Sequence, residues 1–536
     1  MNTKALRQKI LDLAIRGKLV PQDPNDEPAE VLLERIREQK QQMFKEGKLK
    51  KKDIKNDTII FKGEDNLHYE KFQDGTVKCI EEEIPFEVPK GWAWCRLNDI
   101  YNFIDYRGAT PTKIINGIPL VTAKNVKSGY IDYTIDDYIS EEEFKERQQR
   151  GISKKGDILF TTEAPLGNAA LADIEKFSAG QRLITFQQYG PKNELINYVM
   201  LMFILSDFFQ QQLYVNKTGS TVAGIKAAIL KTLWIPVPPY NEQLRISNTL
   251  KSAVNLIDSI SQNKEILSTS ISNTKSKILD LAIRGKLVPQ DPNDEPASVL
   301  LERIRTEKEE LIKQGKIKRD KKESIIFKGE DNSYYEKIGD EIRCIDEELP
   351  FEIPDRWEWV RLENCCCKEI RRGKSPKYIE QSETLVFAQK CNTKYNGIDI
   401  GLAFYLDEST LNKYPEDEYM QDGDIVINST GTGTLGRVGF YRATDNYKSL
   451  PIVPDSHVTV IRSSRELHAF YLYAFMKANQ SELEKKGEGS TNQKELKPLT
   501  LKELYIPVPP YEEQLRIAVS INNAFSLISK LEKSLK

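Results

Sequence analysis

Apolar residues recur at alternating spacings of four and three through the middle of the chain. After Pro238 and Pro239, nine of eleven positions at this spacing are apolar, the full set being Ile246, Leu250, Ala253, Ile257, Ile260, Lys264, Leu267, Ile271, Thr274, Ile278 and Leu281. Such a repeat is typical of a coiled-coil seam. The pattern predicts one helix over 241–284, about 66 Å long at about 1.5 Å per residue, with Gly285 as the residue that ends it.

The chain consists of two copies of one unit. Residues 9–29 recur without a change at 277–297, 268 positions later. Further matches follow in the same order: VLLERIR at 31–37 and 299–305, FKGEDN at 61–66 and 327–332, CIEEEIPFEVP at 79–89 against CIDEELPFEIP at 344–354, and IPVPPYNEQLRI at 235–246 against IPVPPYEEQLRI at 506–517. The segments between Trp92 and Trp234 and between Trp357 and Tyr505 share only isolated anchors. We therefore predict a repeated frame that carries two unlike domains.

The two ends of the chain carry the pieces of a second long helix. Residues 512–536 continue the seam and stop at the equivalent of about 265, and residues 1–16 begin at the equivalent of 269. We expect the two pieces to stack beside helix 241–284 as its antiparallel partner, which would give the molecule pseudo-two-fold symmetry.

Composition narrows the class of protein. With 39% hydrophobic and 29% charged residues, the chain is globular, and collagen-like, disordered and disulfide-scaffold classes are excluded. A net charge of −2 means that any nucleic-acid site must be a local patch. The N-terminus lacks the apolar segment of a signal peptide, and the longest apolar run, Tyr198 to Leu205, predicts a buried helix rather than a membrane span. Seven cysteines, an odd number, favour reduced thiols and a cytoplasmic location.

Three motifs resemble catalytic or nucleotide-binding sequences, but each lacks a required part. Residues 431–436 fit G-x-G-x-x-G, yet a strand-like segment follows where a dinucleotide site needs a helix, so we predict a hairpin. Residues 373–375 resemble the end of a P-loop, but Lys368 stands at the position of the required earlier glycine. The three histidines show no metal-ligand spacing.

The third motif is Val-Pro-Pro-Tyr, at 237–240 and 508–511. It resembles the Asn/Asp-Pro-Pro-Tyr motif of adenine-N6 methyltransferases, but valine cannot accept a hydrogen bond from the target amine. We interpret both copies as turns at the start of a long helix, and we expect the chain to be non-catalytic and to bind no metal.

The combination of two variable inserts, repeated IPVPPY-type turns, long helices and LAIRGKLVPQ helix ends resembles the specificity (S) subunit of type I restriction–modification systems over essentially the whole chain. The Gly-Ser-Thr turn followed by Lys226 or Lys494 is also typical of that family. One departure is the length of the basic-then-acidic extensions at 50–80 and 315–345, whose role is open.

The resemblance implies an α+β fold in which two mixed α/β target recognition domains are joined by two long antiparallel coiled-coil helices. The expected segments are 1–16 and 507–536 for the distal helix, 17–91 and 286–356 for the repeated frame, 92–235 and 357–506 for the recognition domains, and 236–285 for the central helix.

The resemblance also implies a function. Each recognition domain would read one half of an asymmetric bipartite sequence in double-stranded DNA, and the helices would set the spacing and dock two methyltransferase (M) subunits. Restriction (R) subunits would join the same complex. S-adenosylmethionine, ATP and Mg would belong to the partner subunits, so no cofactor is expected in this chain. A self-contained DNA methyltransferase or endonuclease, and a coiled-coil scaffold without sequence-specific DNA binding, are the alternatives.

Among side chains that contact bases in the major groove, Arg favours guanine and Asn or Gln favours adenine, whereas Lys, Ser and Thr are suited to phosphate contacts. In the first domain the candidates in predicted loops are Arg107, Thr110, Thr112, Lys113, Lys124, Asn125, Thr162, Asn168 and Arg182, with Lys217, Thr218, Ser220 and Lys226 as the phosphate-binding end. In the second domain they are Arg371, Arg372, Lys374, Ser375, Gln389, Lys390, Asn428, Ser429, Arg437, Thr491, Asn492, Gln493 and Lys494.

Overall fold

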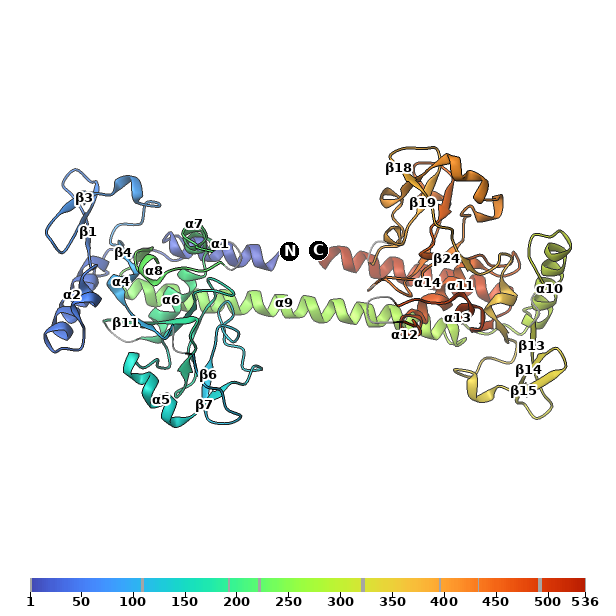
Figure 1. Ribbon diagram of the computed structural model, residues 1–536, viewed down its shortest axis with the longest axis horizontal. Coiled ribbons are helices and arrows are strands. Elements are labelled where there is room, and N and C mark those ends of the chain that lie inside the picture. The colour runs from blue at the N-terminus through green and yellow to red at the C-terminus, as the bar shows by residue number, and fades with distance from the viewer. Residues whose placement is uncertain are drawn as a thin grey trace. The chain divides into compact units, whose positions relative to one another are not determined.

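The chain folds into two compact units, residues 1–264 and 265–536. The computed structural model describes residues 2–107, 110–190, 193–219, 223–319, 323–394, 397–431, 433–489 and 494–535 (Figure 1). Each unit combines helices with several small sheets, as the α+β prediction requires. Among the described residues, no helix combines the length and apolar character of a membrane span.

The predicted long helix is present as α9 (Tyr240–Ile283), which begins directly after the proline turn. It ends as expected at Gly285, which has φ +66°, and the Lys286 amide donates to the Leu281 carbonyl. Four predicted seam positions are buried: Ile246, Leu250, Ile257 and Ile271. The middle of the seam is not, since Leu267 is 43% exposed.

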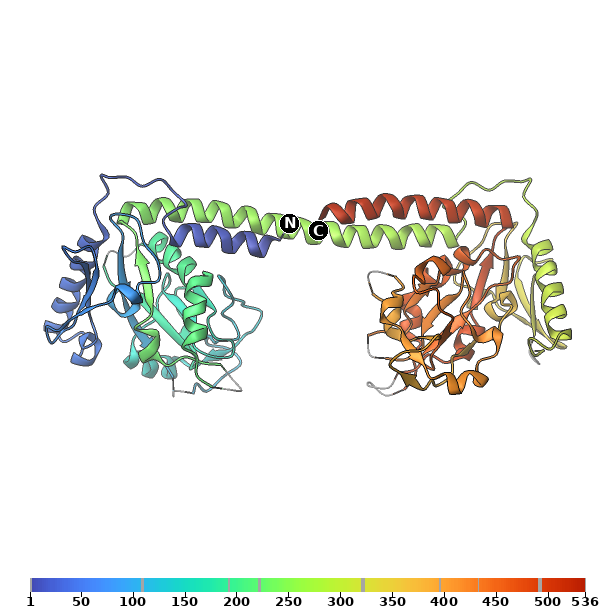
Figure 2. The same cartoon turned by 90° about the horizontal axis from the view of Figure 1, so that it is seen from above.

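In unit 1, α1 (Thr3–Ile15) lies beside the first half of α9 (Figure 2). The two helices run antiparallel, because Arg7 pairs with Asp258 at 3.5 Å while Gln22, beyond the end of α1, donates to Glu242 at 2.7 Å. In unit 2, α14 (Tyr511–Leu535) pairs in the same sense with the second half of α9, and Lys275 contacts Glu532 at 2.8 Å. The expected stacking of the two terminal helices on each other would join the two units and stays a prediction.

The repeated frame closes around a buried glutamate in each unit. Glu242, which is 1% exposed, accepts hydrogen bonds from Trp92 Nε1 at 2.9 Å and Gln22 Nε2 at 2.7 Å. Glu513 accepts the equivalent bonds from Trp357 at 3.0 Å and Gln290 at 2.6 Å. Burial raises the pKa of both glutamates, against the effect of these hydrogen bonds. We call the buried glutamate with its tryptophan and glutamine donors the glutamate clasp. It joins the start of each long helix to the residue before the first strand of its domain.

The first domain is built on a four-stranded antiparallel sheet of order β5-β11-β8-β9. Alternate strand residues serve two cores, as the pleat requires: Ile158 and Phe186 pack with α6, whereas Leu159 and Leu183 pack with the second sheet, β10-β6-β7. The elements are β4 (Ala93–Arg96), α4 (Leu97–Ile100), β5 (Tyr101–Asp105), β6 (Ile118–Val121), β7 (Tyr138–Ile139), α5 (Glu141–Arg147), β8 (Ile158–Thr161), β9 (Ala169–Leu171), β10 (Ser178–Ala179), β11 (Leu183–Gln188), α6 (Glu194–Ile204), α7 (Asp207–Val215), α8 (Ala227–Leu230) and β12 (Trp234–Val237).

The second domain repeats this plan with the sheets β17-β24-β21-β22 and β18-β20-β19-β23. Ile425 and Ile427 pack with α11, and Val426 packs in a separate core with Leu385. The elements are β16 (Glu358–Arg361), β17 (Arg371–Arg372), β18 (Tyr378–Ile379), β19 (Leu385–Phe387), β20 (Phe404–Leu406), β21 (Ile425–Asn428), β22 (Val438–Phe440), β23 (Ile452–Pro454), β24 (Val458–Ile461), α11 (Ala469–Ala478), α12 (Gln480–Lys485), α13 (Pro498–Lys502) and β25 (Tyr505–Val508).

The basic-then-acidic extensions each follow a helix, α2 or α10, and each forms a three-stranded antiparallel sheet. A buried carboxylate ties each sheet to its neighbouring domain: Glu70 pairs with Arg96 at 2.9 Å, and Glu336 with Arg361 at 2.7 Å. The elements are α2 (Ala29–Lys45), α3 (Lys51–Ile54), β1 (Ile59–Lys62), β2 (His68–Lys71) and β3 (Val77–Cys79) in unit 1, and α10 (Ala297–Lys313), β13 (Ser324–Lys328), β14 (Tyr334–Ile338) and β15 (Glu341–Cys344) in unit 2.

Three local predictions are confirmed. The segment around 431–436 connects β21 to β22, which pair antiparallel with Val426 opposite Gly439, so it is a hairpin. Tyr198–Leu205 falls in and directly after α6, whose residues from Val199 to Ile204 are buried. Both Val-Pro-Pro-Tyr turns leave a strand, β12 or β25, and lead directly into α9 or α14.

Candidate DNA interface

A groove of about 480 Å³ opens at the end of β8 in the first domain. Its lining comes from the residues that follow β8, the turn before β11, and residues 218–219 and 224–226, and Arg107 after β5 also lines it. Backbone hydrogen bonds hold these segments together, because the Thr162 amide donates to the Arg182 carbonyl at 3.1 Å and the Ile225 amide donates to the Thr162 carbonyl at 3.0 Å. Five predicted DNA-binding residues line the groove: Arg107, Thr162, Arg182, Thr218 and Lys226.

The charged side chains of the groove differ in how they are paired. Arg107 Nη2 contacts Asp105 at 2.6 Å, and this carboxylate raises the pKa of the guanidinium. Arg182 Nε lies 3.1 Å from Glu163, and both side chains stay about half exposed, at 53% and 44%. Lys226 is exposed, and among the described residues it has no ion-pair partner.

The second domain has the same backbone arrangement at the matching position. The Ser429 amide donates to the His457 carbonyl at 2.8 Å, and the Leu496 amide donates to the Ser429 carbonyl at 2.9 Å. The isolated bridges Thr430–Glu495 and Glu488–Glu495 match Glu163–Gly224 and Thr218–Gly224. These bonds define the equivalent positions of the two domains: Thr162 with Ser429, Glu163 with Thr430, Arg182 with His457, Thr218 with Glu488, Gly224 with Glu495, and Ile225 with Leu496.

This equivalence changes one sequence-based assignment. The counterpart of Lys226 is Lys497 and not Lys494, because Lys226 and Lys497 occupy the N-cap positions of α8 and α13. Unlike Lys226, Lys497 is paired, with its Nζ 2.6 Å from Glu488. Sequence spacing misses this because the turn after the Gly-Ser-Thr motif differs in length between the copies. Lys494 is exposed and stays a prediction as a phosphate contact.

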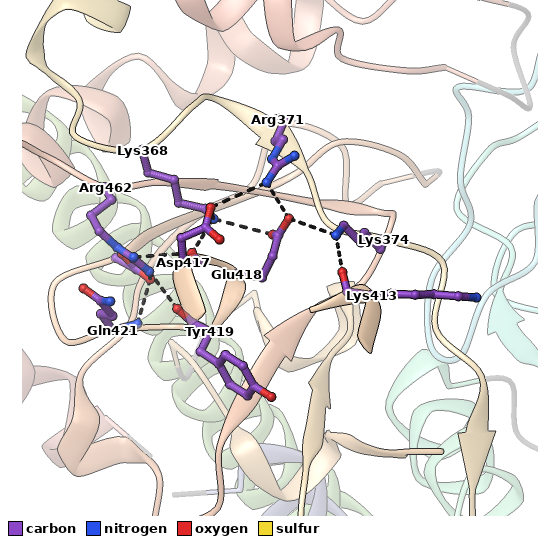
Figure 3. A network of polar contacts seen from close by, with 10 residues as sticks. Lys368, Arg371, Lys374, Lys413, Asp417, Glu418, Tyr419, Gln421 and Arg462 are labelled. Atoms are coloured by element: carbon purple, nitrogen blue, oxygen red, sulfur yellow. Dashed lines mark hydrogen bonds and ion pairs between the residues drawn. The ribbon is translucent and has the colours of Figure 1, made fainter. Parts of the chain in front are cut away.

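Two predicted cations of the second domain are engaged by a buried carboxylate (Figure 3). Glu418 is 3% exposed and lies 2.6 Å from Arg371, 3.5 Å from Lys368 and 3.6 Å from Lys374. Lys374 also donates to the Lys413 carbonyl. Burial lowers the pKa of Lys368, although the facing carboxylates act in the opposite direction. Arg371 and Lys374 thus face an internal negative charge, which reduces their attraction for phosphate.

Arg372 is a third predicted cation of the second domain, and it forms an ion pair with Glu495. Its side chain is 23% exposed, and burial lowers the pKa of its guanidinium. Glu495 occupies the position of Gly224, so the second domain carries an acidic group where the first has no side chain.

Several predicted residues have interior hydrogen bonds instead of exposed polar atoms. Asn125 is 2% exposed, accepts from Thr122 and donates to the carbonyls of Asp132 and Ile135. Asn428 and Ser429 are fully buried, and Ser429 Oγ lies 2.7 Å from Thr459 Oγ1. Thr162, which is 2% exposed, donates to the Arg182 carbonyl. These four side chains support loop geometry in this structure, so base contact by them would require a rearrangement.

The other predicted residues that the structure describes are partly or fully exposed, and they lie in loops except for Gln389 and Lys390, which belong to a short 3-10 helix. Lys113 pairs with Asp137 at 2.7 Å, and Thr110 donates to Gln181 at 2.8 Å. Asn168 and Arg437 donate to backbone carbonyls. The remaining members are Thr112, Lys124, Lys217, Ser375, Gln389 and Lys390. Ser220, Thr491, Asn492 and Gln493 lie outside the described residues.

Sequence reasoning missed Glu163, Gln181, His457 and Lys497. The fold places these residues at the two matched positions, which are the groove at the end of β8 and the equivalent place at the end of β21. A search for Arg, Lys, Asn, Gln, Ser and Thr could not find Glu163 or His457. An alignment of the two copies on their Gly-Asp-Ile anchors places Glu163 opposite Thr430, but it does not place Arg182 opposite His457, because the segments between differ in length. Among the described residues, no group of three His, Cys, Asp or Glu side chains is arranged to hold a metal ion.

Comparisons with known proteins agree with this arrangement. The family profile described as the type I restriction modification DNA specificity domain matches residues 89–268 and 354–536. The EcoEI specificity subunit of Escherichia coli is 27% identical over 99% of this chain and 91% of its own length. The EcoAI specificity subunit of Escherichia coli is 32% identical over 67% of this chain and 62% of its own length.

A solved type I R-M system structure, described as the structural basis of complex assembly and conformational transition, contains a chain with a similar fold. Its TM-score is 0.53 at 17% identity, covering 84% of this chain and 94% of that chain. Because the family profile matches a domain in each of the two units, this chain belongs to the type I restriction–modification DNA specificity family, as a specificity subunit.

Proposed function

We propose that this chain is the non-catalytic specificity subunit that recognises an asymmetric bipartite DNA target, with one half-site for each recognition domain. The observation that supports this proposal most directly is the equivalent backbone arrangement at the ends of β8 and β21. Their backbone hydrogen bonds are the same, but their exposed side chains differ. Identical geometry suits the common shape of duplex DNA, and unlike side chains suit two unlike base sequences.

The partners are the second part of the proposal. Two methyltransferase subunits would dock on the long helices, and restriction subunits would join the complex. Such a methyltransferase subunit would cover the apolar side chains of Leu256 and Ile266 on α9, which are 63% exposed each. S-adenosylmethionine, ATP and Mg would be bound by the partner subunits, and no cofactor by this chain.

The main rival function is a self-contained DNA methyltransferase or endonuclease. In both Val-Pro-Pro-Tyr turns the valine belongs to a strand, β12 or β25, that pairs with the first strand of its domain. The residue that would have to accept a hydrogen bond from a target base is therefore an apolar, buried side chain. A scaffold without sequence preference is the second rival, and the unlike exposed side chains at the matched positions argue against it.

A domain exchange tests the proposal. Residues 92–235 are replaced by the corresponding domain of another specificity subunit, and the reconstituted methyltransferase complex is assayed by sequencing the adenines that it methylates. We expect one half of the recognised sequence to change and the other half to stay. The matched control replaces residues 357–506 and should change only the other half. A change of both halves after a single exchange, or methyl transfer by the isolated chain, would overturn the proposal.

A further inference from the structure

The two central strands of the main sheet, β8 and β11 in the first domain and β21 and β24 in the second, end beside a different side-chain pair in each domain, at equivalent positions. In the first domain the pair is Glu163 and Arg182, with an Nε–Oε1 distance of 3.1 Å. In the second domain Thr430 and His457 stand at the same positions, with Thr430 Oγ1 2.7 Å from His457 Nδ1. The equivalence rests on the shared backbone bonds and bridges at these residues.

The structural role at this position belongs to the backbone. The carbonyls of Arg182 and His457 accept amide hydrogen bonds from Thr162 and Ser429 at the ends of the two central strands. Glu163 and Thr430 form the bridge to the segment before α8 or α13 through their main chains. The Glu163 and Arg182 side chains are 44% and 53% exposed. Because the shared bonds use main-chain atoms alone, the side chains at these positions can differ between the two domains without loss of those bonds.

A carboxylate repels DNA phosphates, so its presence in this groove requires an explanation. Glu163 lines the groove together with Arg107, Arg182 and Lys226. Carboxylates favour one feature of duplex DNA, the cytosine N4 amino group in the major groove, and Arg favours O6 and N7 of guanine. In a G·C pair these atoms lie side by side on the same edge, so a joined Arg–Glu pair matches both bases at once.

The pair in the second domain offers different chemistry. Thr430 and His457 bring a hydroxyl, a methyl group and an imidazole, with no carboxylate and no guanidinium. A hydroxyl contacts either kind of base, and a threonine methyl group can contact the thymine methyl. This pair therefore lacks the paired donor and acceptor geometry that selects G·C.

We propose that Glu163–Arg182 and Thr430–His457 are the specificity-determining pairs of their domains, each reading one base pair at the same relative place in its half-site, and that Glu163–Arg182 selects a G·C pair. This inference rests on the proposed function, since it assigns a role within the half-sites. It adds the acidic Glu163, together with Thr430 and His457, to a recognition surface predicted from basic, amide and hydroxyl residues.

The test places the side-chain pair of one domain at the equivalent position of the other. The full chain carrying Glu163→Thr and Arg182→His is assembled with its methyltransferase subunits and selected against a duplex library that is randomised over both half-sites. We expect the preference at one G·C position of the first half-site to fall on the order of 10- to 100-fold, the range for loss of a good bidentate contact. All positions of the second half-site should keep their preferences.

The reciprocal variant, Thr430→Glu with His457→Arg, is the matched control and should create a G·C preference at one position of the second half-site only. Thermal unfolding of both variants checks that the domains stay folded. An unchanged base profile in either folded variant overturns the inference, and so does a loss of preference across a whole half-site. If the wild-type complex itself selects no sequence, the proposed function fails first and the inference fails with it.

Discussion

The two equivalent lysines at the N-caps of α8 and α13 should contribute differently to DNA binding. Lys226 has no ion-pair partner among the described residues, whereas Lys497 Nζ lies 2.6 Å from Glu488. A lysine that neutralises a phosphate releases about 0.9 of a counterion, and this sets the slope of log affinity against log salt. Lys226 can supply this full contribution, but Lys497 must first share its charge with Glu488.

The expected size follows from the slope. Removal of one phosphate contact by Lys226→Ala should make the slope shallower by about 0.9, so the affinity ratio between about 50 and 200 mM salt should shrink about 3.5-fold. Lys497→Ala should change the slope by roughly half that or less, because its exposed partner already balances the charge. Glu488→Ala should make the slope steeper by up to about 0.9, since it removes the partner of Lys497.

The assay is fluorescence anisotropy of a labelled duplex titrated with the specificity–methyltransferase complex at five salt concentrations. Each variant is compared with wild type on the recognised duplex and on a scrambled one, because a phosphate contact acts equally on both. If Lys497→Ala makes the slope shallower by as much as Lys226→Ala does, the ion pair does not control access to phosphate and the reasoning is refuted. A sequence-dependent loss in Lys226→Ala would instead assign this lysine to base contact.

Three further outcomes are expected. Glu336→Gln should lower the opening free energy of β14 at pH 7 by roughly 2–3 kcal/mol, because the Arg361 and Arg343 hydrogen bonds overcome burial and hold the pKa of Glu336 at about 2. The difference from wild type should shrink as pH falls from about 4.5 towards 2. A pH-independent difference in native-state hydrogen exchange would contradict this. Glu242→Ala should lower the free energy of opening of the first turn of α9 by about 1–3 kcal/mol, since it leaves Trp92 Nε1 without its acceptor. Glu242→Gln should cost less, because a neutral amide avoids the burial of charge that raises the pKa of Glu242. Equal effects of the two substitutions in native-state hydrogen exchange would argue against the role of this glutamate. Insertion of whole helical turns after Ile271 should lengthen the spacer of the recognised sequence and keep both half-sites, and methylation sequencing that finds an unchanged spacer would show that α9 does not set it.

Much of the fold could be predicted because its signals are local or repeated. The 4-3 spacing after Pro239 is a property of one segment, and it predicted α9 to within one residue at each end. The hairpin at 431–436 was predictable because the segment that follows it has strand character. The repeat at 9–29 and 277–297 indicated that the structure formed by these residues occurs twice, and the equivalent hydrogen bonds of Glu242 and Glu513 confirm this.

The site was predicted less completely, because residue type does not reveal burial or pairing. Asn125 has the right chemistry for adenine, but its side chain closes a loop in the interior. Arg371 has the right chemistry for guanine, but it faces the buried Glu418, which is distant from it in sequence. Glu163 was missed because only the folded groove places its carboxylate among cations.

The sequence by itself determined the duplicated plan, the helical frame and the presence of two unlike domains, since each follows from periodicity and identity along the chain. Only the tertiary structure decided which side chains meet: that Lys497 rather than Lys494 is the counterpart of Lys226, and that the Glu163–Arg182 and Thr430–His457 pairs share one position. The physical reason is that pairing and burial depend on distances between strands and turns far apart in sequence. Hydrogen bonds across the sheet fix those distances, and spacing along the chain does not.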